Sequence, residues 1–118
     1  MAITIEAGGS NLKILRLRGL LRKSELDAVL VTETRQWRPS THIKVLLILE
    51  DFKGWEHGAN WGDTTFFEAH GDQIDRIAIV ADSKWEAEML AFVGAGFRRA
   101  PVKFFSANEF ALGWSWLG

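Results

Sequence analysis

Apolar and polar residues alternate near the start of the chain with the two-residue period of β-strands. Residues 3–5 read ITI, and residues 12–18 read LKILRLR, which places leucines on one face of a strand and arginines on the other. Between them, residues 8–11 read GGSN, a composition typical of a tight turn. The pattern predicts two short strands that pair as a hairpin.

Two later segments are apolar almost throughout. Residues 42–49 read HIKVLLIL and residues 76–81 read RIAIVA. Runs of this kind are typical of central strands that are buried on both faces. A shorter run, VKFF at residues 102–105, predicts one more strand.

Helical spacing of apolar residues predicts four helices, and residues 50–60, EDFKGWEHGAN, are predicted to be a loop. Ser24 is the expected N-cap of the first helix, which Pro39 ends. Threonines weaken the helix expected at residues 60–70. The third helix is expected to be capped by Asp82-Ser83 and to end at Gly94 and Gly96. The last helix is expected to begin with a capping box formed by Ser106 and Glu109. Its apolar stripe is expected to contain Phe110, Trp114 and Leu117.

The predicted order of elements is β-β-α-β-α-β-α-β-α. Strands that alternate with helices need crossover connections, which produce parallel pairing. A chain of 118 residues is long enough for one core and has no linker-like segment. We therefore expect a single α/β domain over residues 1–118, with a mixed, mostly parallel five-stranded sheet and four helices.

Charge and composition narrow the function classes. The formal net charge of -1 gives no overall attraction to nucleic acid, so no nucleic-acid partner is expected. The N-terminal residues lack the basic and long apolar regions of a signal peptide, and no segment has the length of a membrane span. We expect a cytoplasmic protein without stable membrane insertion.

No residue pattern points to catalysis. There are no cysteines, and His57 and His70 lack the spacing of a metal site. Glu50 and Asp51 are adjacent, so on a strand they point to opposite faces and are poorly placed to share a proton. Nucleophile-elbow, Walker and Rossmann motifs are missing. We expect no metal, no cofactor and no enzymatic activity.

Four segments together resemble the SpoIIAA-like family of small bacterial STAS/SEC14-type proteins: residues 51–55, 76–85, 104–105 and 116–117. The resemblance implies a STAS-like fold related to CRAL-TRIO domains, and a role either as a regulatory protein-binding module or as a carrier of a nonpolar ligand. SpoIIAA antagonists of anti-sigma factors are switched by a phosphorylated serine after the central strand. Residues 56–60 read EHGAN here, so the phosphorylation switch is not carried over.

Aromatic residues are the strongest remaining signal, with 6 Trp, 8 Phe and no Tyr. Trp37, Phe104 and Trp114 are expected in the core. Six others lie on the segment after the central strand or on the two middle helices, where they either close the core or line a groove for a ligand: Trp55, Trp61, Phe66, Phe67, Trp85 and Phe92.

Two hypotheses follow. In the first, mobile helices at residues 60–70 and 84–93 cover a hydrophobic pocket, and the protein is a carrier or sensor of a nonpolar small molecule or lipid. In the alternative, it is a regulatory protein-protein interaction module that binds a protein partner through acidic residues 50–75, with Asp63 and Asp72 in contact. A large exposed aromatic surface would favour a protein partner or a homodimer.

Overall fold

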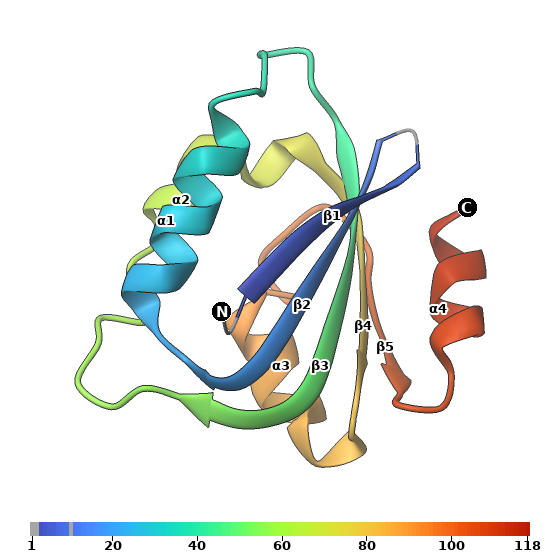
Figure 1. Cartoon of the computed structure of the whole chain (residues 1–118). Helices are drawn as coiled ribbons and strands as arrows, with labels where there is room; N and C mark the ends of the chain where they lie inside the picture. The colour runs from blue at the N-terminus through green and yellow to red at the C-terminus, as the bar shows by residue number, and fades with distance from the viewer. Residues whose placement is uncertain (1–2, 10) are drawn as a thin grey trace.

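The computed structural model describes residues 3–9 and 11–118 and contains one five-stranded sheet with four α-helices (Figure 1). The elements follow in the order β1 (Ile3–Gly9), β2 (Leu12–Leu21), α1 (Lys23–Thr34), β3 (Ile43–Trp55), α2 (Thr65–His70), β4 (Ile74–Ala81), α3 (Glu86–Phe92), β5 (Val102–Ser106) and α4 (Phe110–Leu117). Short 3-10 helices precede β4 (η1, Gly71–Gln73) and α3 (η2, Ser83–Trp85). The predicted α/β class and element order are confirmed.

The strands lie in the sheet in chain order, β1-β2-β3-β4-β5. β1 pairs antiparallel with β2, and the other three pairs are parallel. Because successive crossovers step in one direction and share one handedness, their helices fall on the same face of the sheet. Figure 1 shows α1, α2 and α3 on one face and α4 on the other.

Side chains that alternate along the strands form two separate hydrophobic cores. On the three-helix face, Leu17, Leu47 and Ile79 belong to one core. On the α4 face, Leu46 and Val80 belong to the other. The sheet is thus apolar on both faces at its centre, as the continuous apolar runs of β3 and β4 predict.

Strand β3 continues through the segment predicted to be a loop. Asp51 lies in the left-handed region at φ 48°, and the register with β2 shifts at this point, which marks a β-bulge. The extra residue turns Phe52 toward the three-helix face, where it is buried. The loop prediction at residues 50–55 is therefore wrong, because a bulge breaks the alternation by which a strand is recognised.

The ends of the first two crossover helices also differ from the predictions. α1 begins at Lys23, and its first free amide donates to Glu56 Oε1 at 2.7 Å, so a residue from beyond β3 caps it in place of Ser24. α1 ends at Thr34, before Pro39. The α2 helix is confined to Thr65–His70, which leaves Trp61 in the preceding turn.

The predicted ends of the third helix agree with the structure: Asp82 accepts a hydrogen bond from the Lys84 amide at the start of η2, which leads into α3, and Gly94 has a positive φ of 71° just after α3. The capping box predicted for the last helix forms only in part. The Ser106 amide donates to Glu109 Oε1 at 2.9 Å, but Ser106 ends β5 and α4 begins at Phe110, so the prediction that this helix begins at Ser106 is wrong. The described residues include no helix of the length and apolarity needed to cross a bilayer.

Helix α4 meets the sheet through a different stripe from the one predicted. Gly113 and Leu117 are buried, and Gly113 lies against Val80 and Phe105. Phe110 and Trp114 are each 40% exposed, so the expectation of Trp114 in the core is wrong. Glycine has no side chain to pack, and for this reason its place in the contact is invisible to a hydrophobic pattern.

Candidate ligand-binding cleft

A cleft of about 930 Å³ lies on the three-helix face, between α1, α2, the end of α3 and the sheet. The sheet side is formed by apolar residues of β1 to β4, namely Ile5, Leu15, Leu17, Ile43, Val45, Leu47, Ile74 and Ile77. Leu26, Leu30 and Val31 of α1 form one wall, and Phe66, Phe67 and Phe92 contribute from α2 and α3. The site is therefore a mainly apolar concavity of the size that small-molecule sites have.

The hollow is visible in the burial of neighbouring residues on β3. Leu46, which faces α4, is fully buried. Val45, one residue away on the most central strand, faces the three helices and remains partly exposed, as does Leu15 on the neighbouring strand β2. A central-strand valine is normally covered by the crossover helices, so this exposure means that α1 and α2 do not fill the space above it.

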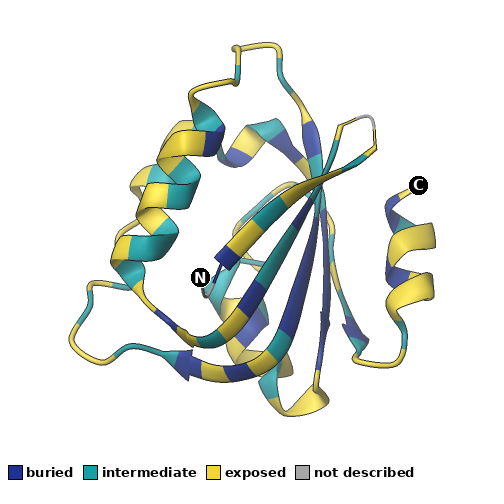
Figure 2. Cartoon of the chain, viewed as in Figure 1, coloured by how far each residue is buried: buried dark blue, intermediate teal, exposed yellow. Residues whose placement is uncertain are grey.

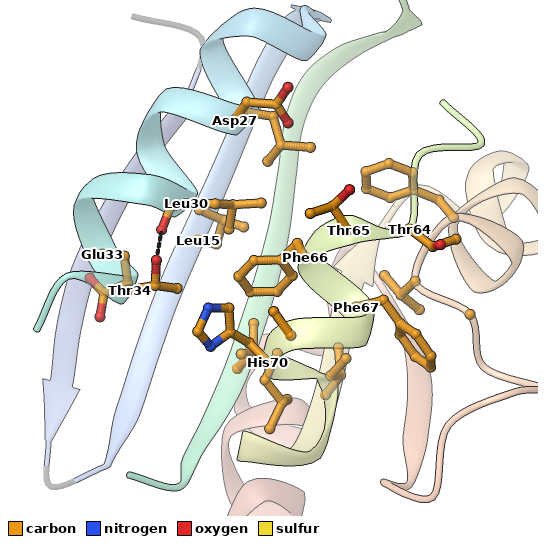
Figure 3. Close-up of a pocket in the computed structure, with 18 of the residues that line it drawn as sticks. Leu15, Asp27, Leu30, Glu33, Thr34, Thr64, Thr65, Phe66, Phe67 and His70 are labelled. Carbon is orange, nitrogen blue, oxygen red and sulfur yellow. Dashed lines mark hydrogen bonds between the residues drawn. The ribbon is translucent and has the colours of Figure 1, made fainter. Parts of the chain in front are cut away.

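Helix α2 covers the cleft with little anchorage. It has six residues, and none of them is buried. Figure 3 shows Phe66 and His70 pointing from α2 toward α1, whereas Phe67 points away from α1. Phe66 lies 6.2 Å from Trp37 and 5.4 Å from His70 between ring centroids. A helix of six residues that is held mainly by a few aromatic contacts has low local stability.

Polar residues mark one end of the cleft. Glu33 of α1 is only 6% exposed, accepts a hydrogen bond from Trp37 Nε1 at 3.0 Å and forms an ion pair with Lys13 Nζ at 3.4 Å. Lys13 stands on β2 on the same face as Leu15 and Leu17. The buried carboxylate is thus neutralised by partners of the protein itself.

At the mouth, an ionic contact joins α1 to the start of α2. Lys23 Nζ donates hydrogen bonds to Asp27 at 2.8 Å and to Asp63 at 3.1 Å. Asp63 also accepts hydrogen bonds from the backbone amide and the hydroxyl group of Thr65. The hydrogen bonds from Thr65, and after them the one from Lys23, lower the pKa of Asp63 from 3.8 to about 2. Asp63 therefore caps α2 and ties it to α1 while it is ionised.

Four of the six predicted ligand residues, Trp61, Phe66, Phe67 and Phe92, line the cleft. Trp55 and Trp85 do not. They pack edge to face with Phe52, with ring centroids 5.1 and 4.9 Å from it, and Trp55 lies 5.5 Å from Phe92. The aromatic cluster is the name used below for Phe52, Trp55, Trp61, Trp85 and Phe92. This cluster closes the cleft at the end of β3. It also anchors α3 to the sheet, together with Met89, which is fully buried.

The two aspartates proposed to contact a partner have different surroundings. Asp63 makes the intramolecular contacts described above. Asp72, in η1, is exposed. Glu50, considered above together with Asp51, lies on the α4 face of the sheet. Its Oε1 accepts hydrogen bonds from Arg16 Nη1 at 3.2 Å and from Arg18 Nη2 at 3.3 Å. In the described residues, no three His, Asp or Glu side chains gather as a metal site.

Sequence reasoning missed the α1 side of the cleft and its polar end. Lys13 precedes Leu15 and Leu17 at two-residue spacing, and Glu33 follows Leu26 and Leu30 at helical spacing. In the strand pattern and in the helix pattern alike, a charged residue occupies a position that faces the core. This was the signal by which the polar end of the cleft could have been predicted.

Comparisons with known proteins agree with this architecture. A solved structure of an uncharacterized protein of the DUF3478 family, with a SpoIIAA-like fold, from Shewanella loihica PV-4, superposes with a TM-score of 0.72 and 21% sequence identity, over 99% of this chain and 93% of that one. No curated protein matches the chain. The SpoIIAA-like family model matches residues 13–118, a span that includes all four helices, β3 to β5 and β2 from its second residue. The chain therefore belongs to the SpoIIAA-like family.

Proposed function

We propose that this protein binds a nonpolar small molecule or lipid in the cleft beneath α2 and acts as its carrier or sensor. The observation that supports the proposal is a hollow of about 930 Å³ with apolar walls from four strands and three helices. Side chains such as Val45 and Leu15 that the protein leaves partly exposed gain favourable burial when a guest covers them. The role needs no catalytic group.

Entry of a guest requires a movable element, and α2 has the properties of one. Its residues are exposed or half-buried, and its attachment to α1 at the mouth is the contact between Lys23 and Asp63. α3 differs, because Met89 and the aromatic cluster fix it to the sheet. Of the two middle helices, α2 is therefore the proposed lid.

The experiment is titration of the purified protein with the neutral dye N-phenyl-1-naphthylamine, followed by dye fluorescence, and native mass spectrometry of the protein as isolated. The dye should fluoresce on binding, and a long-chain lipid should displace it. Val45→Phe places a larger ring in the cleft and should weaken binding at least tenfold. Trp114→Ala, on the exposed side of α4, is the matched control and should leave binding unchanged.

Equal dye binding in wild type and Val45→Phe would place the dye elsewhere and contradict the proposal. The absence of any binding to the wild-type protein would contradict it as well.

The second candidate is a regulatory protein-interaction module of the STAS type. The observation in its favour is the outer side of α4, where Phe110, Leu112 and Trp114 are 40%, 56% and 40% exposed. In this case Trp114→Ala should abolish binding to a protein partner or a homodimer contact, and Val45→Phe should not. Asp72→Lys tests the acidic route, because Asp72 is exposed whereas Asp63 is held by Lys23 and Thr65.

A further inference from the structure

Arg98 brings a cation to the edge of the apolar cleft. It lies in the segment between α3 and β5, and it lines the cleft together with Phe67 and Phe97. Its Nε donates to the Val93 carbonyl at 2.6 Å, and its Cζ lies 4.9 Å from the centroid of the Phe67 ring. These contacts hold the guanidinium group under α2, because Phe67 belongs to that helix.

The guanidinium group is not satisfied by these contacts. Nη1 is buried and has no hydrogen-bond partner within the part of the chain that the structure describes. The two lysines of the lining are paired, Lys13 with Glu33 and Lys23 with Asp27 and Asp63. Among the residues described, no carboxylate lies within 4.0 Å of Arg98.

Arg98 as a whole is half-buried, and withdrawal of part of an unpaired guanidinium group from water is unfavourable, because arginine cannot relieve the cost by losing its proton. Burial lowers the pKa of the Arg98 guanidinium, in keeping with a charge that has lost part of its water without gaining an anion. Cation–π contact with Phe67 recovers part of the loss but leaves the N–H donors of Nη1 unused. An acceptor with negative charge would satisfy both the unused N–H donors and the charge.

We propose that the guest is an anionic amphiphile, whose carboxylate pairs with Arg98 beneath α2 while its hydrocarbon chain fills the cleft. The inference rests on the carrier function proposed above and adds the chemical class of the ligand. A guanidinium group binds a carboxylate with short, charge-assisted hydrogen bonds. One unpaired cation in the lining suits a head with one negative charge, which favours a carboxylate over a doubly charged phosphate monoester.

The arrangement also links the head group to the lid. Phe67 lies 4.9 Å from the Arg98 guanidinium and Phe66 faces the other side of α2, so a bound head group would lie beside the same helix that covers the hydrocarbon chain.

The test is competition against bound N-phenyl-1-naphthylamine by three ligands with the same chain, dodecanoate, 1-dodecanol and dodecyl phosphate, below their aggregation concentrations at neutral pH. Wild type should bind dodecanoate at least tenfold more tightly than dodecanol. Arg98→Met keeps an unbranched apolar side chain and removes the charge, and it should reduce this ratio to about one without weakening dodecanol binding. Arg99→Met makes the same change at the exposed neighbour and should preserve the ratio.

A second measurement uses the wild-type protein and does not depend on the folding of a variant. The side-chain Nε–Hε resonance of Arg98 should shift on addition of dodecanoate and not on addition of dodecanol. A persistent preference for dodecanoate in Arg98→Met, or an unshifted Arg98 resonance, would overturn the assignment of the head-group site.

The outcomes also separate this inference from the proposal on which it rests. Equal affinity of the wild type for dodecanoate and dodecanol refutes the carboxylate head and leaves the nonpolar carrier in place. Tighter binding of dodecyl phosphate than of dodecanoate overturns the choice of a singly charged head. No displacement of the dye by any of the three refutes the carrier function itself.

Discussion

The α4 face and the three-helix face of the same sheet are packed to different densities. On the α4 face, Gly113 lets the helix backbone approach Val80 and Phe105, and the residues beneath it are fully or almost fully buried. On the other face, α1 buries only Glu33 and α2 buries nothing among their described residues, and a cleft of about 930 Å³ remains. In Figure 2, α1 and α2 have exposed and intermediate colours over most of their length, whereas α4 has dark positions on the side toward the sheet.

The comparison shows that apolar composition does not decide whether a face is closed. Both faces present Leu, Ile and Val from the central strands. The difference lies in the helix surfaces that meet the sheet. On one face, Gly113 of α4 permits a close approach of the helix. On the other face, the inward stripe of α1 contains the charged Glu33, and α2 has only six residues.

Truncation of one leucine on each face should give the largest difference. Leu46→Ala removes a fully buried side chain beneath α4 and should lower the free energy of unfolding by about 3 kcal/mol, since a cavity is left in a closed core. Leu15→Ala, on the cleft side, should cost about 1 kcal/mol, because the leucine is already partly exposed. Urea denaturation measures both, and equal losses would mean that the two faces are equally packed.

Enlargement of one valine on each face should also cost more stability on the α4 face. Val80→Phe, against Gly113 and α4, should cost roughly 1–3 kcal/mol through overpacking. Val45→Phe adds the same volume to the cleft and should change stability by less than about 0.5 kcal/mol. If Val45→Phe proved as destabilising as Val80→Phe in thermal or urea unfolding, the cleft would not be free space.

The weakest expected effect concerns the ionic contact that holds α2. Asp63→Asn should increase amide exchange within Thr65–His70 several-fold at neutral pH and leave exchange in β4 unchanged, because the contact is local. The matched Asp72→Asn, at an exposed site beside α2, should have no such effect.

The pH dependence of the same contact has a defined sign. The folded pKa of Asp63, about 2, lies below its ordinary value of 3.8. Its contribution to the stability of α2 is therefore fully present above pH 3.8 and is lost as the pH falls through about 2. The difference in α2 protection factors between wild type and Asp63→Asn should be constant above that range and decline as the pH falls toward 2, and a difference that kept its full size at pH 2 would assign the effect to another group.

The sequence predicts the order of strands and helices because each buried strand is long, apolar and separated by a helical pattern. Departures from the prediction occur where a single backbone geometry overrides the pattern. At Asp51 a left-handed residue shifts the alternation, so a strand that continues to Trp55 resembles a polar loop. At Gly113 the contact is made by the residue with no side chain, so the stripe through Trp114 is read as the buried one.

The candidate site was predictable in part. Trp61, Phe66, Phe67 and Phe92 were identified by the gathering of large apolar residues on weakly helical segments. Whether such residues enclose a space or fill it depends on the distances between the helices and the sheet. The spacing of apolar residues along the sequence carries no information about these distances. Arg98 gave no signal, because an arginine after a helix is ordinarily a solvated surface residue, and its partial burial against Phe67 arises from the tertiary fold.

The length of α2 has a consequence for how the cleft can change. Six helical residues make a roof of about 9 Å, over a floor whose β4 strand of eight residues extends for about 26 Å. A roof so much shorter than its floor leaves room at its edges whatever side chains it carries. Point substitutions are thus suited to altering which guest fits, whereas sealing the space would take an insertion of further helical turns.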